Sequence, residues 1–224
     1  MGSGEKMKLQ VEPERYYNIR YDKKSRFCSY WHQIQEILLL RPKEVLEIGI
    51  GNGFVSEYLK KRGIKLITLD IDRRLNPDIV GSVLELPFAD ESFSVLACYE
   101  LLEHIPYEDF NKALSEILRV CKSYAILSLP DVNRVCRFYL EIPKIMHIKK
   151  LIPFLRLRKH IYNFDGQHYW EIGKSGYPLR KIVNDIKLAG FKIEKTYRVF
   201  ERPYHRFFLL KKSKYHVHSK IRQN

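Results

Sequence analysis

The sequence predicts an α/β fold, because stretches with the apolar runs of buried strands alternate with stretches of helical periodicity. The clearest unit is an apolar strand at 45–48, a turn with glycines at three alternate positions, and a helix that follows at once. A second strand at 64–72 and a buried strand at 95–99 come next, before an amphipathic helix at 107–120 and another apolar strand at 124–130.

Length and composition fit one globular domain, with room for an insertion. The chain has 224 residues, of which 45% are hydrophobic, enough for a buried core. No apolar run is long enough to span a membrane, and no signal-peptide pattern is present. The four cysteines form no C-x-x-C pair and have no metal-ligand spacing, so we expect reduced thiols, no metal site and a cytoplasmic protein.

Positive charge is concentrated in the C-terminal part of the chain. Residues 1–130 carry 18 Lys and Arg against 19 Asp and Glu, whereas residues 131–224 carry 22 against 7. Such asymmetry predicts an anionic or membrane-associated partner, and hence a peripheral membrane location, with nucleic acid as an alternative partner. The sequence leaves the oligomeric state open.

An arm and a helix precede the glycine turn. Residues 1–25 are polar and mixed in charge, which predicts a flexible N-terminal arm. Residues 26–40 have the periodicity of a helix that ends before Pro42. Its expected apolar stripe comprises Trp31, Ile34, Ile37 and Leu38. The helix after the turn ends at Gly63, which suits the left-handed conformation of a C-terminal cap.

Residues 131–175 interrupt the alternating pattern and predict an insertion or lid. Basic and apolar side chains are mixed from 142 to 160, and two prolines break this stretch into short pieces. The composition fits either a segment that rests on an anionic membrane surface or a lid over an active site. The polar and aromatic stretch 164–171 predicts acceptor binding, with His168 and Glu171 as candidate proton acceptors, unless it is a packed aromatic corner.

The C-terminal part predicts one helix and two strands. The helix spans 177–189 and is capped by Gly190, and a strand at 191–200 follows. The alternation of that strand changes phase, which predicts a β-bulge. The last strand is expected at 206–211, and residues 212–224 form a basic tail that we expect to be flexible.

The glycine turn carries the strongest functional signal. Glycine tolerates positive φ and lets a ligand approach the backbone, and the helix that follows offers free N–H groups. A dinucleotide site has the spacing G-x-G-x-x-G, but here the spacing is G-x-G-x-G and Phe54 stands where the third glycine belongs. Glu47 lies two residues before the first glycine, where a carboxylate suits a ligand with positive charge better than a pyrophosphate.

The stretch from Val45 to Pro130 resembles the class I S-adenosylmethionine-dependent methyltransferases of the type-11 group. The glycine turn matches the family pattern E/D-x-G-x-G-x-G, and the run LPF-x-D-x-SF at 86–93 and the LEH loop at 102–104 are typical of the group. The resemblance covers about residues 26–210 and implies a methyltransferase domain at 26–211. It implies a Rossmann-like, seven-stranded, mostly parallel sheet with the last strand antiparallel, helices on both faces and a basic insertion after the fifth strand.

The resemblance implies S-adenosylmethionine as the cofactor, released as S-adenosylhomocysteine. A carboxylate at Asp70, at the end of the second strand, can accept hydrogen bonds from both ribose hydroxyls. Glu47 and the glycine turn would hold the methionine end, and the loop after the fourth strand would border the sulfonium. The cofactor-binding residues that the resemblance implies are Tyr30, His32, Glu47, Ile48, Gly49, Ile50, Gly51, Asn52, Gly53, Asp70, Ile71, Ser82, Val83, Tyr99 and Glu100.

Four positions leave alternatives open. Ser82 stands where the group usually has an acidic residue that contacts adenine, so this contact is weaker or is made by the backbone N–H of Val83. Asp72 also fits the family pattern, but we expect it to face solvent. Tyr30 and His32 lie on the helix that packs beside the cofactor in the family, although ordinary packing explains them equally well.

The candidate general base is His104, in the loop at the carboxyl end of the strand at 95–99, with His168 as a second candidate. A structural hydrogen-bonding role is the alternative for His104. We expect methyl transfer to an oxygen or nitrogen atom of a small-molecule, lipid or glycan-type acceptor, because the motifs that serve base methylation are absent. The alternatives are an RNA methyltransferase and a non-catalytic protein whose nucleoside pocket accompanies binding to an anionic surface. The missing third glycine argues against a nicotinamide-dependent oxidoreductase.

Overall fold

The centre of the molecule is a seven-stranded sheet with the strand order β3-β2-β1-β4-β5-β9-β8. The computed structural model describes residues 12–154 and 166–213. The strands of the sheet are β1 (Val45–Ile48), β2 (Leu66–Asp70), β3 (Ile79–Val80), β4 (Phe93–Tyr99), β5 (Cys121–Pro130), β8 (Phe191–Arg198) and β9 (His205–Lys212). The first five are parallel, and β9 runs antiparallel between β5 and β8. The predicted mostly parallel sheet with an antiparallel last strand is confirmed.

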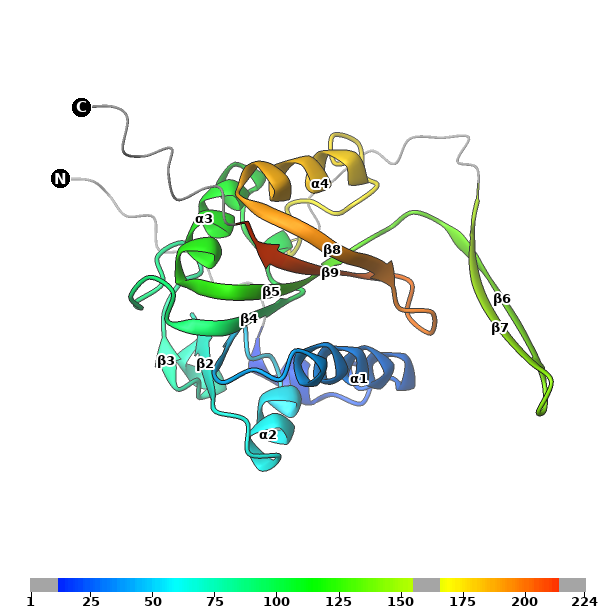
Figure 1. Cartoon of the computed structure of the whole chain (residues 1–224), viewed down its shortest axis with the longest axis horizontal. Helices are drawn as coiled ribbons and strands as arrows, with labels where there is room; N and C mark the ends of the chain where they lie inside the picture. Colours follow the sequence, from blue (N-terminus) through cyan, green and yellow to red (C-terminus); the bar gives the residue numbers. More distant parts are fainter. Residues whose placement is uncertain (1–11, 155–165, 214–224) are drawn as a thin grey trace.

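Helices cover both faces of the sheet, as predicted (Figure 1). One face carries α1 (Lys24–Leu39) and α2 (Phe54–Lys61), and the other carries α3 (Phe110–Val120) and α4 (Leu179–Leu188). The short 3-10 turns are η1 (Pro13–Tyr17), η2 (Arg73–Leu75), η3 (Leu102–His104) and η4 (Tyr107–Asp109). Among the described residues, no helix has both the length and the apolar character needed to cross a bilayer.

The helix α1 packs three of the four predicted stripe residues, Ile34, Ile37 and Leu38, against the core. Ile37 is fully buried, but Trp31 is 55% exposed. The polar residue Glu36 is buried instead, because Lys195 and Tyr197 of β8 donate hydrogen bonds to its carboxylate at 2.6 and 2.8 Å. A satisfied carboxylate is tolerated in the interior, so the helix turns this side inward and leaves Trp31 outside.

Two local predictions concern turns and bulges. Gly63 follows α2 with φ 81°, as a glycine at a helix C-terminus does. The register of β8 against β9 shifts between Ile193 and Lys195, which confirms the predicted bulge.

The strand β1 is buried along its whole length, Glu47 included. This burial on both sides is expected for a central parallel strand.

The first described part of the insertion after β5 is a β-hairpin. Its strands β6 (Val135–Ile142) and β7 (Met146–Pro153) form a separate two-stranded sheet that stands off the main one (Figure 1). Pro143 lies in the hairpin turn and Pro153 ends β7, which agrees with the prediction that the prolines divide this stretch. At these positions a missing N–H breaks no ladder hydrogen bond in the strand interior.

The N-terminal arm is ordered where it is described. Residues 12–25 form η1 and a turn that reaches α1, and Tyr16 packs edge-on against Tyr21 at 5.3 Å between ring centroids. These contacts give residues 12–25 a defined conformation, and the flexibility of the arm stays a prediction. Residues 1–11, and the basic tail beyond residue 213, lie outside the described residues.

Candidate functional site

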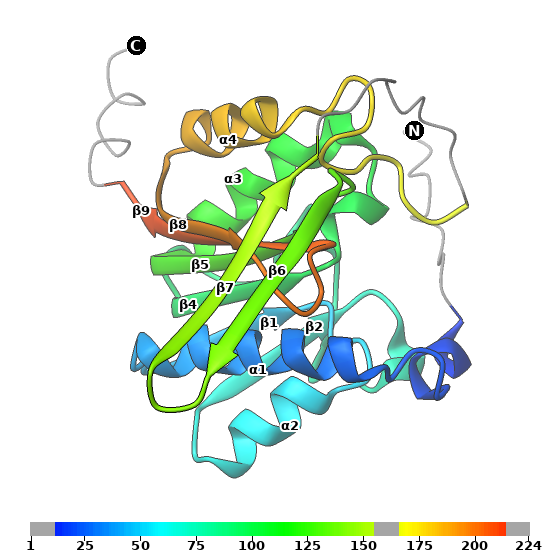
Figure 2. The same ribbon diagram turned by 90° about the vertical axis from the view of Figure 1, so that its right-hand side faces the viewer.

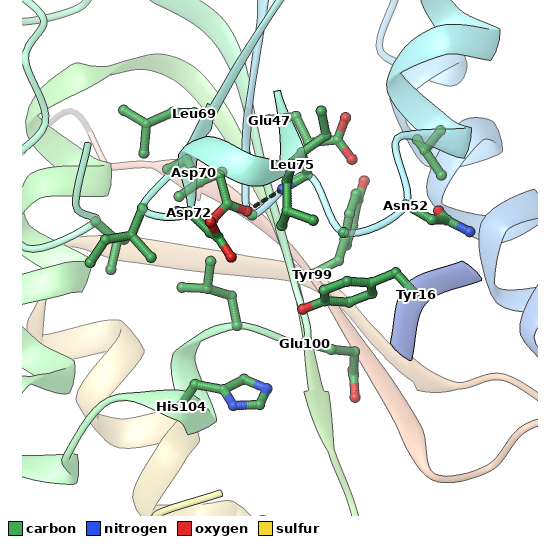
Figure 3. Close-up of a pocket in the computed structure, with 18 of the residues that line it drawn as sticks. Tyr16, Glu47, Asn52, Leu69, Asp70, Asp72, Leu75, Tyr99, Glu100 and His104 are labelled. Atoms are coloured by element: carbon green, nitrogen blue, oxygen red, sulfur yellow. Dashed lines mark hydrogen bonds between the residues drawn. The ribbon is translucent and has the colours of Figure 1, made fainter. Parts of the chain in front are cut away.

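A cavity lies at the carboxyl ends of β1, β2 and β4, where parallel strands bring their ends to one edge. Most of the predicted cofactor residues line it. They are Tyr30, Glu47, Ile48, Gly49, Ile50, Gly51, Asn52, Asp70, Ile71, Val83, Tyr99 and Glu100. Figure 3 shows Asp70 and Asp72 on one side of this space and Glu100 and His104 on another, with the ring of Tyr16 between them in this view.

The glycine turn has the conformation that its sequence predicts. Gly49, Gly51 and Gly53 have φ values of 84°, 56° and 73°, in the left-handed region that favours glycine. A Cβ atom at Gly49 would overlap with the Leu101 side chain. A Cβ atom at Gly51 would lie 3.8 Å from the ring of Tyr16 and would enter the cavity wall.

The carboxylate of Asp70 is fixed against the turn. One oxygen accepts a hydrogen bond from the Ile50 N–H at 3.0 Å, and the other accepts one from the Asp72 N–H at 2.9 Å. Burial raises the pKa of Asp70 above its usual value. Each carboxylate oxygen has two lone pairs, so the group keeps capacity for two further donors from a ligand.

Glu47 is a buried carboxylate at the opposite end of the turn. Its Oε2 atom has no hydrogen-bond partner among the described residues. Burial raises the pKa of Glu47 to about 8. A buried, unpaired carboxyl group is costly unless a ligand pairs with it, so the position fits a cationic group such as an ammonium.

The half-buried Glu100 and the buried His205 add two titratable groups to the cavity wall. Burial raises the pKa of Glu100, and burial lowers the pKa of His205 well below its usual value. The Arg202 Nε–H donates to His205 Nε2 at 2.7 Å, which requires the proton of the neutral ring to lie on Nδ1. This Nδ1 has no partner among the described residues. His205 was missed because the sequence around it signals only a link between strands.

The two candidate bases lie side by side, but only His104 lines the cavity. Its ring centroid is 4.8 Å from that of His168. His104 Nδ1 lies 3.0 Å from the Gln167 carbonyl oxygen, which can only accept, so Nδ1 carries the proton and Nε2 the lone pair. His104 thus has an unprotonated Nε2, as a general base requires, whereas His168 does not line the cavity.

Glu171 is too acidic for the role of proton acceptor. Burial raises the pKa of Glu171, but donation by His168, Lys174 and Tyr204 outweighs this effect and lowers the pKa to about 2. The neighbouring Trp170 is fully buried and its Nε1–H donates to the Ile105 carbonyl at 3.2 Å. Around Trp170, the polar and aromatic stretch noted in the sequence is therefore a packed aromatic corner, which was the alternative prediction.

A group that could hold a metal ion also lies here. Ligand atoms of Glu103, His104 and His168 lie within 4.8 Å of one another, and Glu103 is fully buried with no partner for either carboxylate oxygen among the described residues. The expectation of no ligand set missed this cluster, because the three residues come from two loops that the sequence separates by more than 60 positions.

The N-terminal arm supplies a wall that sequence analysis missed entirely. Tyr16 and Tyr21 of the arm line the cavity beside Arg26 of α1, whose guanidinium lies 3.6 Å from the centroid of the Tyr21 ring. The arm is held near the turn by a hydrogen bond from Asn52 to Asp22 at 3.4 Å. A polar, mixed-charge composition gives no signal for such packing, because it depends on partners distant in the sequence.

Three predicted cofactor residues do not line the cavity, so their role stays a prediction, and the exposure expected of Asp72 was wrong. His32 does not line the cavity and instead packs beside Tyr197, with 3.2 Å between its Nδ1 and the hydroxyl oxygen. Gly53 is the N-cap of α2, and the Ser82 hydroxyl accepts a hydrogen bond from the Leu84 N–H at 3.1 Å; neither residue lines the cavity. Asp72 is buried and lines the cavity instead of facing solvent, because Arg74 pairs with its carboxylate at 2.9 Å.

Comparison with known proteins adds a family to this geometry. Residues 46–129 match the model of a methyltransferase domain. The ubiquinone biosynthesis O-methyltransferase of Hahella chejuensis is 31% identical over 136 residues, which is 54% of this chain and 56% of that protein. An uncharacterised protein of Methanocaldococcus jannaschii is 33% identical over 99 residues, which is 41% of this chain and 43% of that protein. The chain thus spans about half the length of the curated relatives it matches.

Solved structures share the fold at low sequence identity. The 1,6-didemethyltoxoflavin-N1-methyltransferase of Burkholderia thailandensis, solved with its substrate and S-adenosylhomocysteine, has a TM-score of 0.59 at 13% identity and covers 89% of this chain and 84% of its own. The magnesium protoporphyrin IX methyltransferase of Synechocystis, solved with S-adenosylhomocysteine, has a TM-score of 0.57 at 16% identity, with 89% and 92% covered. These similarities show a common Rossmann-like fold.

Proposed function

We propose, from the premise that this chain contains a class I S-adenosylmethionine-dependent methyltransferase domain of the type-11 group, that it methylates an oxygen or nitrogen atom of a small-molecule, lipid or glycan-type acceptor. The name of the Hahella chejuensis relative, an O-methyltransferase, supports an oxygen acceptor. When bound, S-adenosylmethionine supplies an activated methyl group on a sulfonium and leaves as S-adenosylhomocysteine.

One observation carries this proposal: the Glu47 carboxyl, whose Oε2 has no partner among the described residues, and the anchored Asp70 carboxylate line one cavity on either side of the glycine turn. Glu47 would pair with the ammonium of the methionine end, and Asp70 would accept from the ribose hydroxyls. Val83 and Ile71 would flank the adenine, and the backbone from Tyr99 to Glu100 would border the sulfonium.

The protein's remaining task is to align the acceptor and manage its proton. Alignment of reacting groups alone can lower a barrier by several kcal/mol. His104 would accept the proton of a hydroxyl acceptor at Nε2, because its Nδ1 proton is held by the Gln167 carbonyl. The aromatic ring of Tyr16, which lies against the glycine turn, would help to exclude water from the cavity.

The test is calorimetric titration of S-adenosylmethionine, S-adenosylhomocysteine and NAD into the protein and into two valine variants. Gly51→Val places a branched side chain into the cavity wall, so we expect no measurable binding of either adenosyl compound. Gly63→Val is the matched control, because Gly63 also has positive φ but has nothing within 4 Å of its Cβ position. Equal affinities of the two variants, or preferential NAD binding by the wild type, would refute the proposal.

An RNA acceptor is the second candidate, supported by the 22 basic against 7 acidic residues from 131 to 224. A screen with methyl-labelled cofactor over metabolite, lipid and RNA pools separates the two. Label in RNA, together with RNA affinity that falls steeply with salt, would favour this candidate. Label in the lipid or metabolite pool would favour the first.

A further inference from the structure

The hairpin β6–β7 has two chemically different faces. Directly paired residues of an antiparallel ladder point to the same face, and successive pairs alternate. The pairs Arg137/Leu151 and Tyr139/Lys149 lie on one face, called here the inner face. The opposite face, called the outer face, carries Phe138, Leu140, Ile142, Met146, Ile148 and Ile152, with Lys150 among them.

The inner face is the one that contacts the domain. Lys149 Nζ lies 3.0 Å from a carboxylate oxygen of Glu201, and Arg137 Nη1 donates to the Glu201 carbonyl at 3.2 Å. The ring of Tyr139 lies 6.4 Å from that of Phe200. Since these contacts all come from one face, the outer face points away from the domain. Figure 2 shows the hairpin in front of the sheet and of α1, with a broad side turned outward.

The outer face exposes large apolar side chains next to one another. Phe138, Ile152 and Met146 are 45%, 49% and 38% exposed, and Ile145 in the hairpin turn is 78% exposed. A contiguous apolar patch on a protruding ribbon is costly in water and marks a surface with a partner. The hairpin is also held to the domain by few contacts, so its length serves something other than core packing.

The charges around this patch identify the partner. Lys150 lies on the outer face, Lys144 lies in the turn, and Arg134 lies at the base. The single acidic residue from 134 to 154 is Glu141, on the inner face, where it accepts a hydrogen bond from Tyr139. An apolar patch bordered by cations complements a surface of acyl chains and anionic headgroups. Two copies joined through this face would bring the same cations together, and their repulsion disfavours a second copy as the partner.

We propose that the outer face of the β6–β7 hairpin docks on an anionic lipid bilayer, with Phe138, Ile142 and Ile152 entering the headgroup region and Lys144 and Lys150 pairing with lipid phosphates. The hairpin leaves the sheet from the carboxyl end of β5, at the edge where the cavity lies, so docking brings this edge near the bilayer. The inference does not depend on the proposed methyl transfer, because bilayer binding is measured without cofactor.

The test is co-sedimentation of the full chain with phosphatidylcholine vesicles that contain or lack phosphatidylglycerol. We expect binding to the anionic vesicles only, weakened by salt. Phe138→Glu and Lys150→Glu should each lower the partition coefficient by about tenfold. Leu188→Glu is the matched control, because Leu188 is 68% exposed on α4, away from the hairpin, and should leave binding unchanged.

Three results would overturn the proposal. The first is an absence of binding to anionic vesicles by the wild-type chain. The second is an equal loss of binding in Leu188→Glu. The third is a stable dimer in sedimentation equilibrium that Phe138→Glu dissociates, which would make a second copy the occupant of the outer face. Unchanged thermal unfolding and unchanged S-adenosylmethionine affinity of each variant would show that its fold is intact.

Discussion

The cavity edge and the hairpin differ in which side chains they bury and which they expose. At the cavity edge, groups such as Asp70 and Glu47 are buried and held in place by the turn and the sheet. On the hairpin, the apolar side chains of the outer face are exposed in a row on a two-stranded ribbon. A preorganised cavity suits one small ligand of defined shape, whereas a row of apolar side chains with cations suits an extended, fluid surface.

The two regions also differ in how they connect to the core. The cavity is built from strand ends that register against one another over four parallel strands. The hairpin is joined to the domain through a short link after β5 and through contacts to Glu201 and Phe200. Changes in one region should therefore leave the other nearly intact.

The largest effect is expected where the regions meet, at Asp131. Its carboxylate is buried, accepts from Arg206 Nε at 2.7 Å and lies 3.7 Å from Arg198 Nη1. Asp131→Ala leaves both cations without this partner. We therefore expect the free energy of unfolding, measured by urea denaturation, to fall by about 3–5 kcal/mol. Glu194→Ala, which removes an exposed pair with Lys192, should cost less than about 1 kcal/mol. Similar losses in both variants would contradict the picture of a buried anchor.

Glu47→Gln should stabilise the ligand-free protein while it weakens cofactor binding. The pKa of Glu47 is about 8 in the fold against an ordinary 4.5, so the folded state holds a proton that the unfolded state releases, and stability falls as pH rises between these values. At pH 7 this costs about 3 kcal/mol, which the amide removes. Urea denaturation of both proteins at pH 5 and pH 7 measures the effect. Parallel pH dependence of the two would show that Glu47 is not protonated in the fold.

Asp70→Asn should lower S-adenosylmethionine affinity by about 100-fold, because two hydrogen bonds to a charged acceptor contribute about 1.5–3 kcal/mol each and the amide retains part of them. Calorimetry measures the change, and Asp90→Asn, whose carboxylate is 74% exposed, serves as the control. Binding to anionic vesicles should stay within twofold of the wild type, since Asp70 does not contact the hairpin. A joint loss of both activities would mean that the two regions are coupled.

The smallest effect is expected for Phe138→Glu on cofactor binding. No residue of β6 or β7 lines the cavity, so S-adenosylmethionine affinity should stay within about twofold, or about 0.4 kcal/mol, of the wild type. Calorimetry at low salt checks this value. A tenfold loss would show that the hairpin acts as a lid, which the sequence left open and the cavity lining does not support.

Much of the cavity was predictable from sequence, because its signals are local. The three glycines need positive φ, the apolar strand runs have their characteristic length, and Asp70 follows a strand directly. His205 and the arm residues Tyr16 and Tyr21 were not predictable in the same way. They reach the cavity across loops and across the sheet, and no short-range pattern records such contacts.

Local sequence patterns were enough to predict the α/β class, the turn conformation and the carboxylates at either side of the turn, because backbone sterics and strand periodicity act over a few residues. In contrast, the position of His32 outside the cavity and the exposure of Trp31 depend on contacts between distant elements, because the buried Glu36 pairs with β8. Only strand pairing decided which side chains of the hairpin face outward. A shift of register by one residue would have turned the apolar row toward the domain, since side chains alternate with a period of two.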